Sequence, residues 1–218
     1  MTTGTDPSSA DTHHRDRHTR RRERTRRKLL DAAKALFARQ GVENTRINEI
    51  TDEADVGFGS FYNHFESKEA IVEAVLGEEV AAHGTAVELV TADLDDPAEI
   101  VAVAHRYFVN LARIDPDWGW LLIRLDLKVS LESLGPFARR DLERGIRAGR
   151  FRVPNKRVAL LATGGALLGV MRDVLDGHAP KDADRHHAEG VLRLLGLSAE
   201  DAAEVARQPM PKVPRQDP

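Results

Sequence analysis

The segment "DEADVGFGSFYNHFESKEA", from Asp52 to Ala70, constrains the fold more than any other part of the chain. It concentrates glycine and aromatic residues in a sequence of which only 5% is aromatic. The glycines and Asp55 predict a tight turn, and residues 60–65 leave room for only a short helix. A helix this short is not stable alone and must be held by burial of Phe61 and Phe65. The segment therefore predicts the last helix of a small packed unit.

Helices are also predicted on both sides of this turn. Apolar residues recur at helical spacing before Gly41, which supplies a natural stop. Thr45 offers a side-chain oxygen that can cap a second helix, and Ser67 offers the same to a helix beginning at Lys68. Short helices joined by a tight turn form a helix–turn–helix unit. The side chains predicted to form its core are Leu36, Phe37, Ile50, Ala54, Val56, Phe61 and Phe65.

The rest of the chain has helical periodicity, and alternating strand patterns are essentially absent. Proline, glycine and paired aspartates separate the further segments predicted to be helical. These are Lys68–Val90, Pro97–Ile114, Asp117–Leu131, Pro136–Arg150, Asn155–Asp176, Ala183–Leu195 and Ala199–Arg207. We therefore predict an all-α protein of about ten helices.

Charge is distributed unevenly along the chain, although the net charge is only -3. Arginines dominate between His13 and Lys28, whereas acidic residues dominate between Glu49 and Glu99, where Lys68 is the only cation. Such an asymmetry favours nucleic acid or an anionic surface as a partner.

Composition excludes several classes of protein. The absence of cysteine excludes disulfides, thiolate metal sites and cysteine catalysis. The N-terminus is polar and basic, so no signal peptide is visible. The longest apolar run, Val158 to Met171, is shorter than the roughly 20 residues of a membrane span. We expect a cytoplasmic protein without a membrane partner.

The segment "ARQGVENTRINEITDEADVGFGSFYNHFESKEAIVEAVL" resembles the DNA-binding domain of TetR-type transcriptional repressors. The resemblance extends from about Arg24 to Leu76. Its landmarks are Gly41, Thr45, Ile50, Ala54, Val56, Gly59, Phe61, Tyr62, His64, Phe65, Lys68 and Glu69. Beyond Leu76 the chain is similar to this family only in the number and spacing of its helices.

The resemblance implies DNA-binding roles for particular residues. These are Thr45 and Arg46 at the DNA backbone, Phe58, Gly59 and Ser60 at base edges, and Tyr62, His64 and Lys68 at phosphates. Asn63 projects a further hydrogen-bond donor from the same predicted helix. Phosphate contacts of this kind fix register, whereas contacts to base edges carry sequence information.

This chain departs from the family pattern at Asp55, Gly57 and Thr51, of which Thr51 replaces a frequent alanine beside Ile50. Asp55 stands where the family usually has glycine, and aspartate tolerates the left-handed conformation that the turn needs. Gly57 stands where serine or threonine commonly caps the next helix, so we expect a weaker cap. Phe58 is unusual at a position that is often polar. It could contact a thymine methyl or fold back onto the protein, and we favour the second.

Aromatic and aliphatic residues cluster in the middle helices, where plain core packing explains most such patterns. The family resemblance implies that these helices enclose a ligand cavity. The residues proposed to line it are Tyr107, Phe108, Trp118, Trp120, Leu121, Leu125 and Phe137. His105, with neighbouring arginines, could anchor a ligand or could equally be solvated or ion-paired. His178, His186 and His187 lack a carboxylate at ligand spacing, so we predict neither a metal site nor a cofactor, and place them in an exposed loop and helix start.

The run "VALLATGGALLGVMRDVL" is apolar nearly all round, so its helix needs burial on most sides. Its glycines would permit close approach of another helix. Together with the apolar residues of the following helix, it suits a four-helix interface between two identical subunits. Burial inside a monomer is the alternative, and the resemblance favours a homodimer.

These observations predict a ligand-responsive repressor that binds double-stranded DNA at a palindromic operator and is released by a small hydrophobic or amphipathic effector. We divide the chain into a disordered basic arm (1–22), a helix–turn–helix domain (23–66), a ligand-binding and dimerisation domain (67–208) and a flexible tail (209–218). An activator of the same fold and a nonspecific architectural DNA-binding protein remain alternatives. An enzyme using His105 with Asp126 or Asp173 is disfavoured because no catalytic motif is present, and no catalytic residues are predicted.

Overall fold

The computed structural model describes residues 8–124 and 127–211, which contain ten helices and no β-strand. The helices are α1 (Ser8–Gln40), α2 (Ile47–Glu53), α3 (Phe58–Tyr62), α4 (Lys68–Thr91), α5 (Pro97–Ile114), α6 (Pro116–Arg124), α7 (Leu127–Arg147), α8 (Lys156–Leu175), α9 (Ala183–Leu194) and α10 (Ala199–Arg207). The predicted all-α class is confirmed.

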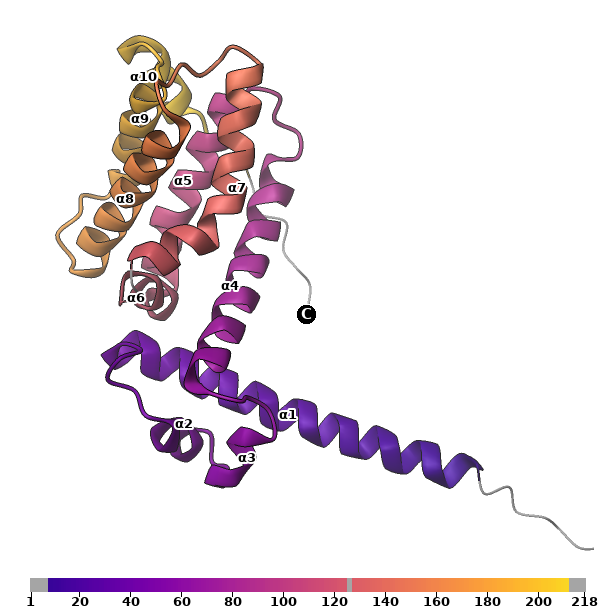
Figure 1. The fold of residues 1–218 in the computed structure, drawn as a ribbon. Helices are drawn as coiled ribbons and strands as arrows, with labels where there is room; N and C mark the ends of the chain where they lie inside the picture. Colours follow the sequence, from indigo (N-terminus) through magenta and orange to yellow (C-terminus); the bar gives the residue numbers. More distant parts are fainter. Residues whose placement is uncertain (1–7, 125–126, 212–218) are drawn as a thin grey trace, which may run out of the picture.

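The helices form a small N-terminal unit and a larger bundle (Figure 1). Helices α1 to α3 make up the N-terminal unit, and α4 runs from it along the side of the bundle. Helices α5 to α10 form the bundle, and α6 lies at the end that faces α1. Because α1 contacts both α4 and α6, the N-terminal unit is attached to the bundle through two separate helices.

The N-terminal unit has a single closed core. All the side chains predicted for it lie in one apolar cluster, with Val56 only partly buried at its edge. Phe37, Ile50 and Phe61 are fully buried in this cluster. Each such side chain contributes about 1.5–3 kcal/mol by leaving water. Leu121 of α6 completes the same cluster, so a residue of the bundle is part of the helix–turn–helix core.

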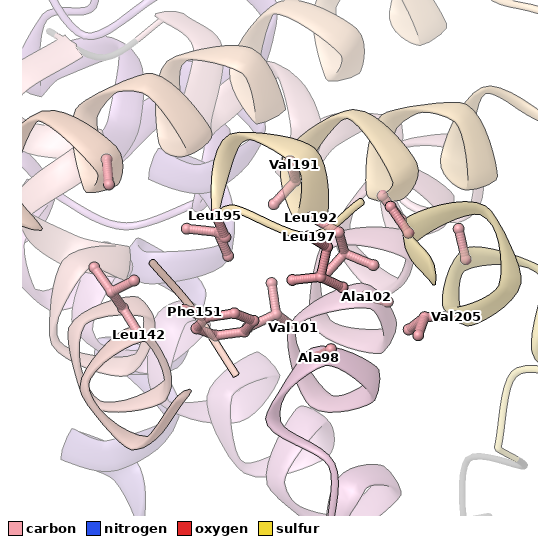
Figure 2. Close-up of a cluster of buried hydrophobic side chains, with 14 residues drawn as sticks. Ala98, Val101, Ala102, Leu142, Phe151, Val191, Leu192, Leu195, Leu197 and Val205 are labelled. Atoms are coloured by element: carbon pink, nitrogen blue, oxygen red, sulfur yellow. The ribbon is translucent and has the colours of Figure 1, made fainter. Parts of the chain in front are cut away.

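The far end of the bundle has its own core, in which Phe151 is central. In Figure 2, Leu142, Val101 and Leu195 lie around this ring, and the cluster continues through Leu192 and Leu197 toward Val205 of α10. Gly145 of α7 has no side chain in the space that the Phe151 ring occupies, so a larger residue there would displace the ring. A third cluster, centred on Trp118 and Met171, joins α5, α6 and α8.

The N-terminal arm differs from the prediction. Helix α1 begins at Ser8 rather than near residue 23, so residues 8–22 are helical and the expected disorder is wrong for them. No proline or glycine occurs between Ser8 and Gln40, and the arginines, alanines and leucines there favour helix. Residues 1–7 lie outside the described part. At the other end, residues 209–211 have no regular secondary structure, and the rest of the predicted tail is outside the described residues.

The boundary between α6 and α7 also differs from the prediction. We expected a break at Pro136, but α7 continues through it from Leu127 to Arg147. A proline inside a helix costs about 3 kcal/mol because it removes a backbone hydrogen bond. The next residue, Phe137, packs its ring against Gly84 of α4, and this contact offsets part of that cost.

By length and apolar composition alone, α8 is the one described helix that could cross a bilayer. Helices of soluble bundles meet the same criterion, so a single such helix is weak evidence of membrane insertion. Here α8 packs against α5, α6, α7 and α9. It is therefore a helix of the bundle.

Candidate nucleic-acid interface and internal cavity

The turn between α2 and α3 depends on Asp55. This residue has a φ of 52°, the only positive φ of a non-glycine residue in the described chain, so the predicted left-handed conformation is confirmed. The next residue, Val56, donates its backbone N–H to the carbonyl of Thr51 at 3.0 Å, which closes the turn. Gly57 is the N-cap of α3 and makes no side-chain cap, as expected. The turn therefore presents α3 by backbone geometry rather than by side-chain capping.

Helix α3 has a buried side and an aromatic exposed side. Phe61 is fully buried, whereas Phe58 and Tyr62 are 53% and 52% exposed. The rings of Phe58 and Tyr62 meet edge to face, with centroids 5.7 Å apart. Phe58 thus stays outside the core with its ring against Tyr62 and about half of its surface exposed, so its choice between a thymine methyl and the protein surface stays a prediction. A side chain on Gly59 would meet nothing within 4 Å, so this surface is open to a partner.

Positive charge from α1 lies beside the end of α3. The guanidinium of Arg22 donates to the carbonyl of Asn63 at 3.4 Å, and Arg26 lies over the ring of Phe65 at 4.6 Å. Partial burial lowers the pKa of His64, and the charges of Arg22 and Arg26 lower it further. The lowered pKa favours the neutral form of the His64 ring beside these two cations.

The start of α2 differs from the prediction at Thr45. Its side chain is buried and donates to the carbonyl of Gly41 at 2.8 Å, so it does not cap α2. The N-cap is Arg46, whose backbone N–H donates to the carboxylate of Glu49 at 2.7 Å. Of the predicted pair at the DNA backbone, only Arg46 is exposed. The expected DNA contact by the Thr45 side chain is therefore corrected to an internal hydrogen bond.

Lys68 is tied to the loop between α1 and α2. Its Nζ donates to the carbonyls of Val42 and Thr45 at 2.8 and 3.0 Å. These two bonds leave one ammonium hydrogen, so the predicted phosphate contact stays a prediction and the loop-holding role is an addition to it. The hydroxyl of Ser67 accepts from the backbone N–H of Ala70 at 3.2 Å, which confirms the predicted cap of α4.

A cavity of 1050 Å³ lies between α4, α5, α7 and α8. Its wall is largely apolar and includes Val87, Phe108, Phe137, Leu160 and Leu167. Two of the residues predicted to line a cavity, Phe108 and Phe137, are in this wall. A third, Leu125, is outside the described residues. The cavity is large enough for a drug-sized organic molecule.

The other predicted lining residues lie elsewhere in the described structure. Trp118 is buried behind the wall, where it stacks on Phe108 with centroids 5.6 Å apart. Tyr107 bonds to His83 across 3.0 Å, Leu121 is in the helix–turn–helix core, and Trp120 lies beneath the guanidinium of Arg172 at 5.0 Å. Core and cavity wall are both apolar here, so composition did not separate them.

A polar network borders the cavity on the side of α5 and α9. His105 lies in the cavity wall, and its Nδ1 is 3.0 Å from Nε2 of His187. The next residue on α5, Arg106, donates to the carboxylate of Asp184 at 2.9 Å, and Asn110 donates to the same oxygen at 3.3 Å. His187 is buried, so placing it in an exposed helix start was wrong. Asp184 was missed; its spacing of three residues from His187 on α9 was the available signal.

Burial controls the charge of the two histidines. It lowers the pKa of His105 to about 3, with a further contribution from the neighbouring His187, and lowers the pKa of His187 to about 4. Both rings are therefore neutral near pH 7. Among the described residues, no group of three or more metal-ligating side chains comes together here or elsewhere.

Two family models match the chain over most of its length. The model described as "Bacterial regulatory proteins, tetR family" matches residues 29–75, and "Tetracyclin repressor-like, C-terminal domain" matches residues 96–208. Among curated proteins, the chain is 39% identical over 79 residues to the transcriptional repressor KstR2 of Rhodococcus jostii, covering 36% of this chain and 39% of the relative. It is 33% identical over 95 residues to a probable acrEF/envCD operon repressor of Escherichia coli, covering 41% of this chain and 43% of the relative. These matches span less than half of either relative.

Solved structures extend the similarity over nearly the whole chain. The structure of RolR in complex with resorcinol is 35% identical and superposes with a TM-score of 0.71, covering 90% of this chain and 100% of RolR. The regulator FadR from Bacillus subtilis, in complex with stearoyl-CoA, is 19% identical with a TM-score of 0.62, covering 78% of this chain and 97% of FadR. The second likeness supports the fold alone.

Proposed function

We propose that this chain, which belongs to the TetR family of bacterial regulatory proteins, is a homodimeric repressor that a small effector releases from a palindromic operator. Membership of this family makes it a DNA-binding transcriptional regulator rather than an enzyme. The observation that carries the proposal is the combination of an exposed recognition surface on α3 with an internal cavity in the attached bundle. A regulator of this kind acts in the cytoplasm.

On the DNA side, α3 enters the major groove with its exposed aromatic face toward the bases. Phe58 and Gly59 lie at the leading end, where the missing side chain of Gly59 lets the helix backbone approach the groove closely. Tyr62, His64 and the remaining hydrogen of Lys68 bind phosphates and fix the register. The arginines of α1 add sequence-independent attraction, which weakens as salt rises.

The dimer forms through the outer faces of α8 and α9. Val158, Leu161 and Leu194 are 61%, 48% and 53% exposed, although they are large apolar residues. Side chains placed at Gly165 or Gly169 would meet nothing within 4 Å, so this face can approach another helix closely. A second copy covers these residues and forms a four-helix interface. The two recognition helices then meet half-sites about one helical turn apart.

On the effector side, the cavity accepts a small hydrophobic or amphipathic molecule. Aliphatic and aromatic residues make up most of its lining, and the polar residues include His105 on α5 and charged side chains of α7 and the start of α8, among them Arg140 and Arg157. RolR, the more similar of the two compared structures, is described with resorcinol, a small aromatic diol. An effector changes DNA affinity only if it binds the two states of the dimer with different affinities, and the usual coupling is about 1–3 kcal/mol.

Helix α6 provides a physical route from the cavity to the DNA-binding unit. Trp118 stacks on Phe108 of the cavity wall, and Leu121, one turn along α6, is buried in the helix–turn–helix core. At the start of α6, Asp115 forms an ion pair with Lys34 of α1 at 3.3 Å. An effector that displaces Phe108 therefore acts on α1 through α6.

The test is binding of the purified protein to DNA upstream of its own gene and to random DNA across a salt series. Selective binding with a two-fold symmetric footprint, by a protein that sediments as a dimer, supports the proposal. Equal affinity for both DNAs indicates an architectural protein instead. Repression or activation is then read from a reporter gene under the identified operator.

A further inference from the structure

We propose that His105 is the polar contact for the effector and hydrogen-bonds a hydroxyl group of an otherwise apolar, aromatic-sized ligand, while His187 positions the His105 ring. This inference rests on the proposed function, because it assigns chemistry to the effector cavity. It names a ligand class, neutral hydroxyl compounds such as phenols, and a residue pair that selects it.

The geometry leaves one edge of the His105 ring for a ligand. Its Nδ1 is paired with Nε2 of His187 at 3.0 Å, and no described residue is bonded to its Nε2. Among the described residues, no buried side-chain nitrogen or oxygen is left without a hydrogen bond. Since His105 lies in the cavity wall, its Nε2 is open to the cavity. On the α5 side of the cavity, whose lining there includes Val101, Ala104 and Phe108, a ligand group meets this ring nitrogen.

The two tautomers of the histidine pair select the ligand group. If His105 donates to His187, its Nε2 is a bare acceptor; if His187 donates, Nε2 of His105 carries a hydrogen and donates. A hydroxyl both donates and accepts, so it pairs with either arrangement. A carboxylate only accepts and an ammonium only donates. Each of these therefore fits only one tautomer.

The charge state of the pair also favours a neutral partner. Burial lowers the pKa values of both rings well below 7, so neither carries a charge that would attract an anion. A charged ligand group at His105 would lose hydration without an opposite charge from this pair, because the charged residues of the wall, such as Arg140 and Arg157, lie on α7 and at the start of α8. A neutral hydroxyl loses less on leaving water and regains a hydrogen bond from the ring.

His187 is a positioning residue, because it touches His105 rather than the cavity. It is held on α9, whose Asp184 is fixed by Arg106 of α5. This buried ion pair keeps α9 in register with α5 and so keeps the two imidazoles in contact. Without His187, the His105 ring would lose the partner that fixes its orientation and tautomer.

The inference is tested by calorimetric binding of resorcinol and of m-xylene, which has the same ring with methyl groups in place of the hydroxyls. The measured quantity is the preference, the Kd of m-xylene divided by the Kd of resorcinol. His105→Leu should lower this preference about tenfold, the worth of one hydrogen bond that discriminates between the ligands. His105→Gln, which places a polar atom near the position of Nε2, should retain most of it. An unchanged preference in His105→Leu overturns the inference, as does failure of resorcinol to bind the wild-type protein.

His187 is tested by the same ratio. His187→Leu should lower the preference severalfold, and His187→Gln should restore it because its amide nitrogen can replace Nε2. If His187→Leu and His187→Gln behave alike, the positioning role is wrong. His83→Leu is the matched control, since His83 is a partly buried histidine bonded to Tyr107 and is not among the residues that line the cavity. It should leave the preference unchanged.

The readout uses no DNA, so it is independent of the proposed function. A protein that selects resorcinol but fails to bind its upstream DNA selectively would retain the cavity assignment and lose the proposed repressor. A protein that binds its operator but shows no dependence on His105 would retain the repressor and lose the cavity assignment.

Discussion

The two ends of the molecule use aromatic side chains in opposite ways. In the helix–turn–helix unit the core is closed, and the aromatic residues Phe58 and Tyr62 face outward. In the bundle, Phe108 and Phe137 face inward around a cavity of 1050 Å³. Protein interiors normally contain few voids larger than a water molecule. The closed core of the first region therefore holds its surface in a fixed shape, whereas the second region has space for a ligand.

The largest expected loss of stability comes from truncating a buried side chain in the core of the helix–turn–helix unit. Phe61→Ala should lower the free energy of unfolding by about 3–5 kcal/mol, because Phe61 is fully buried among tightly packed neighbours. Urea denaturation followed by circular dichroism measures this. Phe58→Ala, on the outer face of the same helix, should change stability by no more than about 0.5 kcal/mol. Similar losses in both variants would contradict the assignment of inner and outer faces.

The stability of the bundle should be more sensitive to acid than that of the helix–turn–helix unit, because the bundle buries His105 and His187. Their pKa values in the folded state are about 3 and about 4, below the ordinary value of 6.5, so the unfolded chain binds more protons as the pH falls. Stability that is fully present above pH 6.5 should therefore fall as the pH is lowered, down to about pH 4 for His187 and about pH 3 for His105, by up to about 1.4 kcal/mol per pH unit for each histidine. Denaturation at a series of pH values measures the slope.

The matched control for this acid effect is His187→Gln, which removes one titrating group and keeps a hydrogen-bonding nitrogen. It should reduce the slope. A slope that does not change with this substitution would assign the acid sensitivity to other groups.

A smaller change in the free energy of unfolding is expected from substitutions in α4, where this helix contacts the cavity wall. A side chain at Gly84 would collide with the ring of Phe137, so Gly84→Ala should cost about 1–3 kcal/mol and alter effector affinity. Gly77 lies on the same helix with nothing within 4 Å of an added side chain, so Gly77→Ala should stabilise by about 0.5–1 kcal/mol. Thermal denaturation of both variants gives the comparison. Opposite signs support the packing described for Phe137, and equal signs contradict it.

The smallest expected free-energy change concerns recognition at the outer face. Phe58→Ala should weaken binding to the operator about tenfold, the order of magnitude for one base contact, and leave binding to random DNA nearly unchanged. Fluorescence anisotropy with both DNAs at one salt concentration measures this. An equal loss on both DNAs would place Phe58 at the DNA backbone instead of at the bases.

The helix–turn–helix core was predictable because it depends on near neighbours in the chain. The spacing of Ile50, Phe61 and Phe65 and the left-handed tolerance of Asp55 are local properties, and the structure confirms them. Thr45 was mispredicted although it lies in the same unit. Its hydroxyl has two nearby options, the helix start and the Gly41 carbonyl, and tertiary packing selects the second.

The cavity was only partly predictable, because its wall is assembled from helices far apart in sequence. Trp118 and Phe137 have similar apolar character, yet one is sealed in the core and the other faces the cavity. The contact between His105 and His187 joins residues 82 positions apart, and no local pattern indicates such a pair. The start of α1 differs from the prediction for another reason: residues 8–22 are highly charged, but they contain no proline or glycine and continue the helix.

The burial of Leu121 within the helix–turn–helix core has a consequence for engineering. Exchanging DNA-binding and sensing modules between related regulators requires a junction that cuts few contacts. A junction after α4 would separate α1 from the α6 residue that completes its core. A functional hybrid should therefore take α6 and α1 from the same parent. Alternatively, it should have at position 121 the side chain that packs against α1 in the parent that supplies α1.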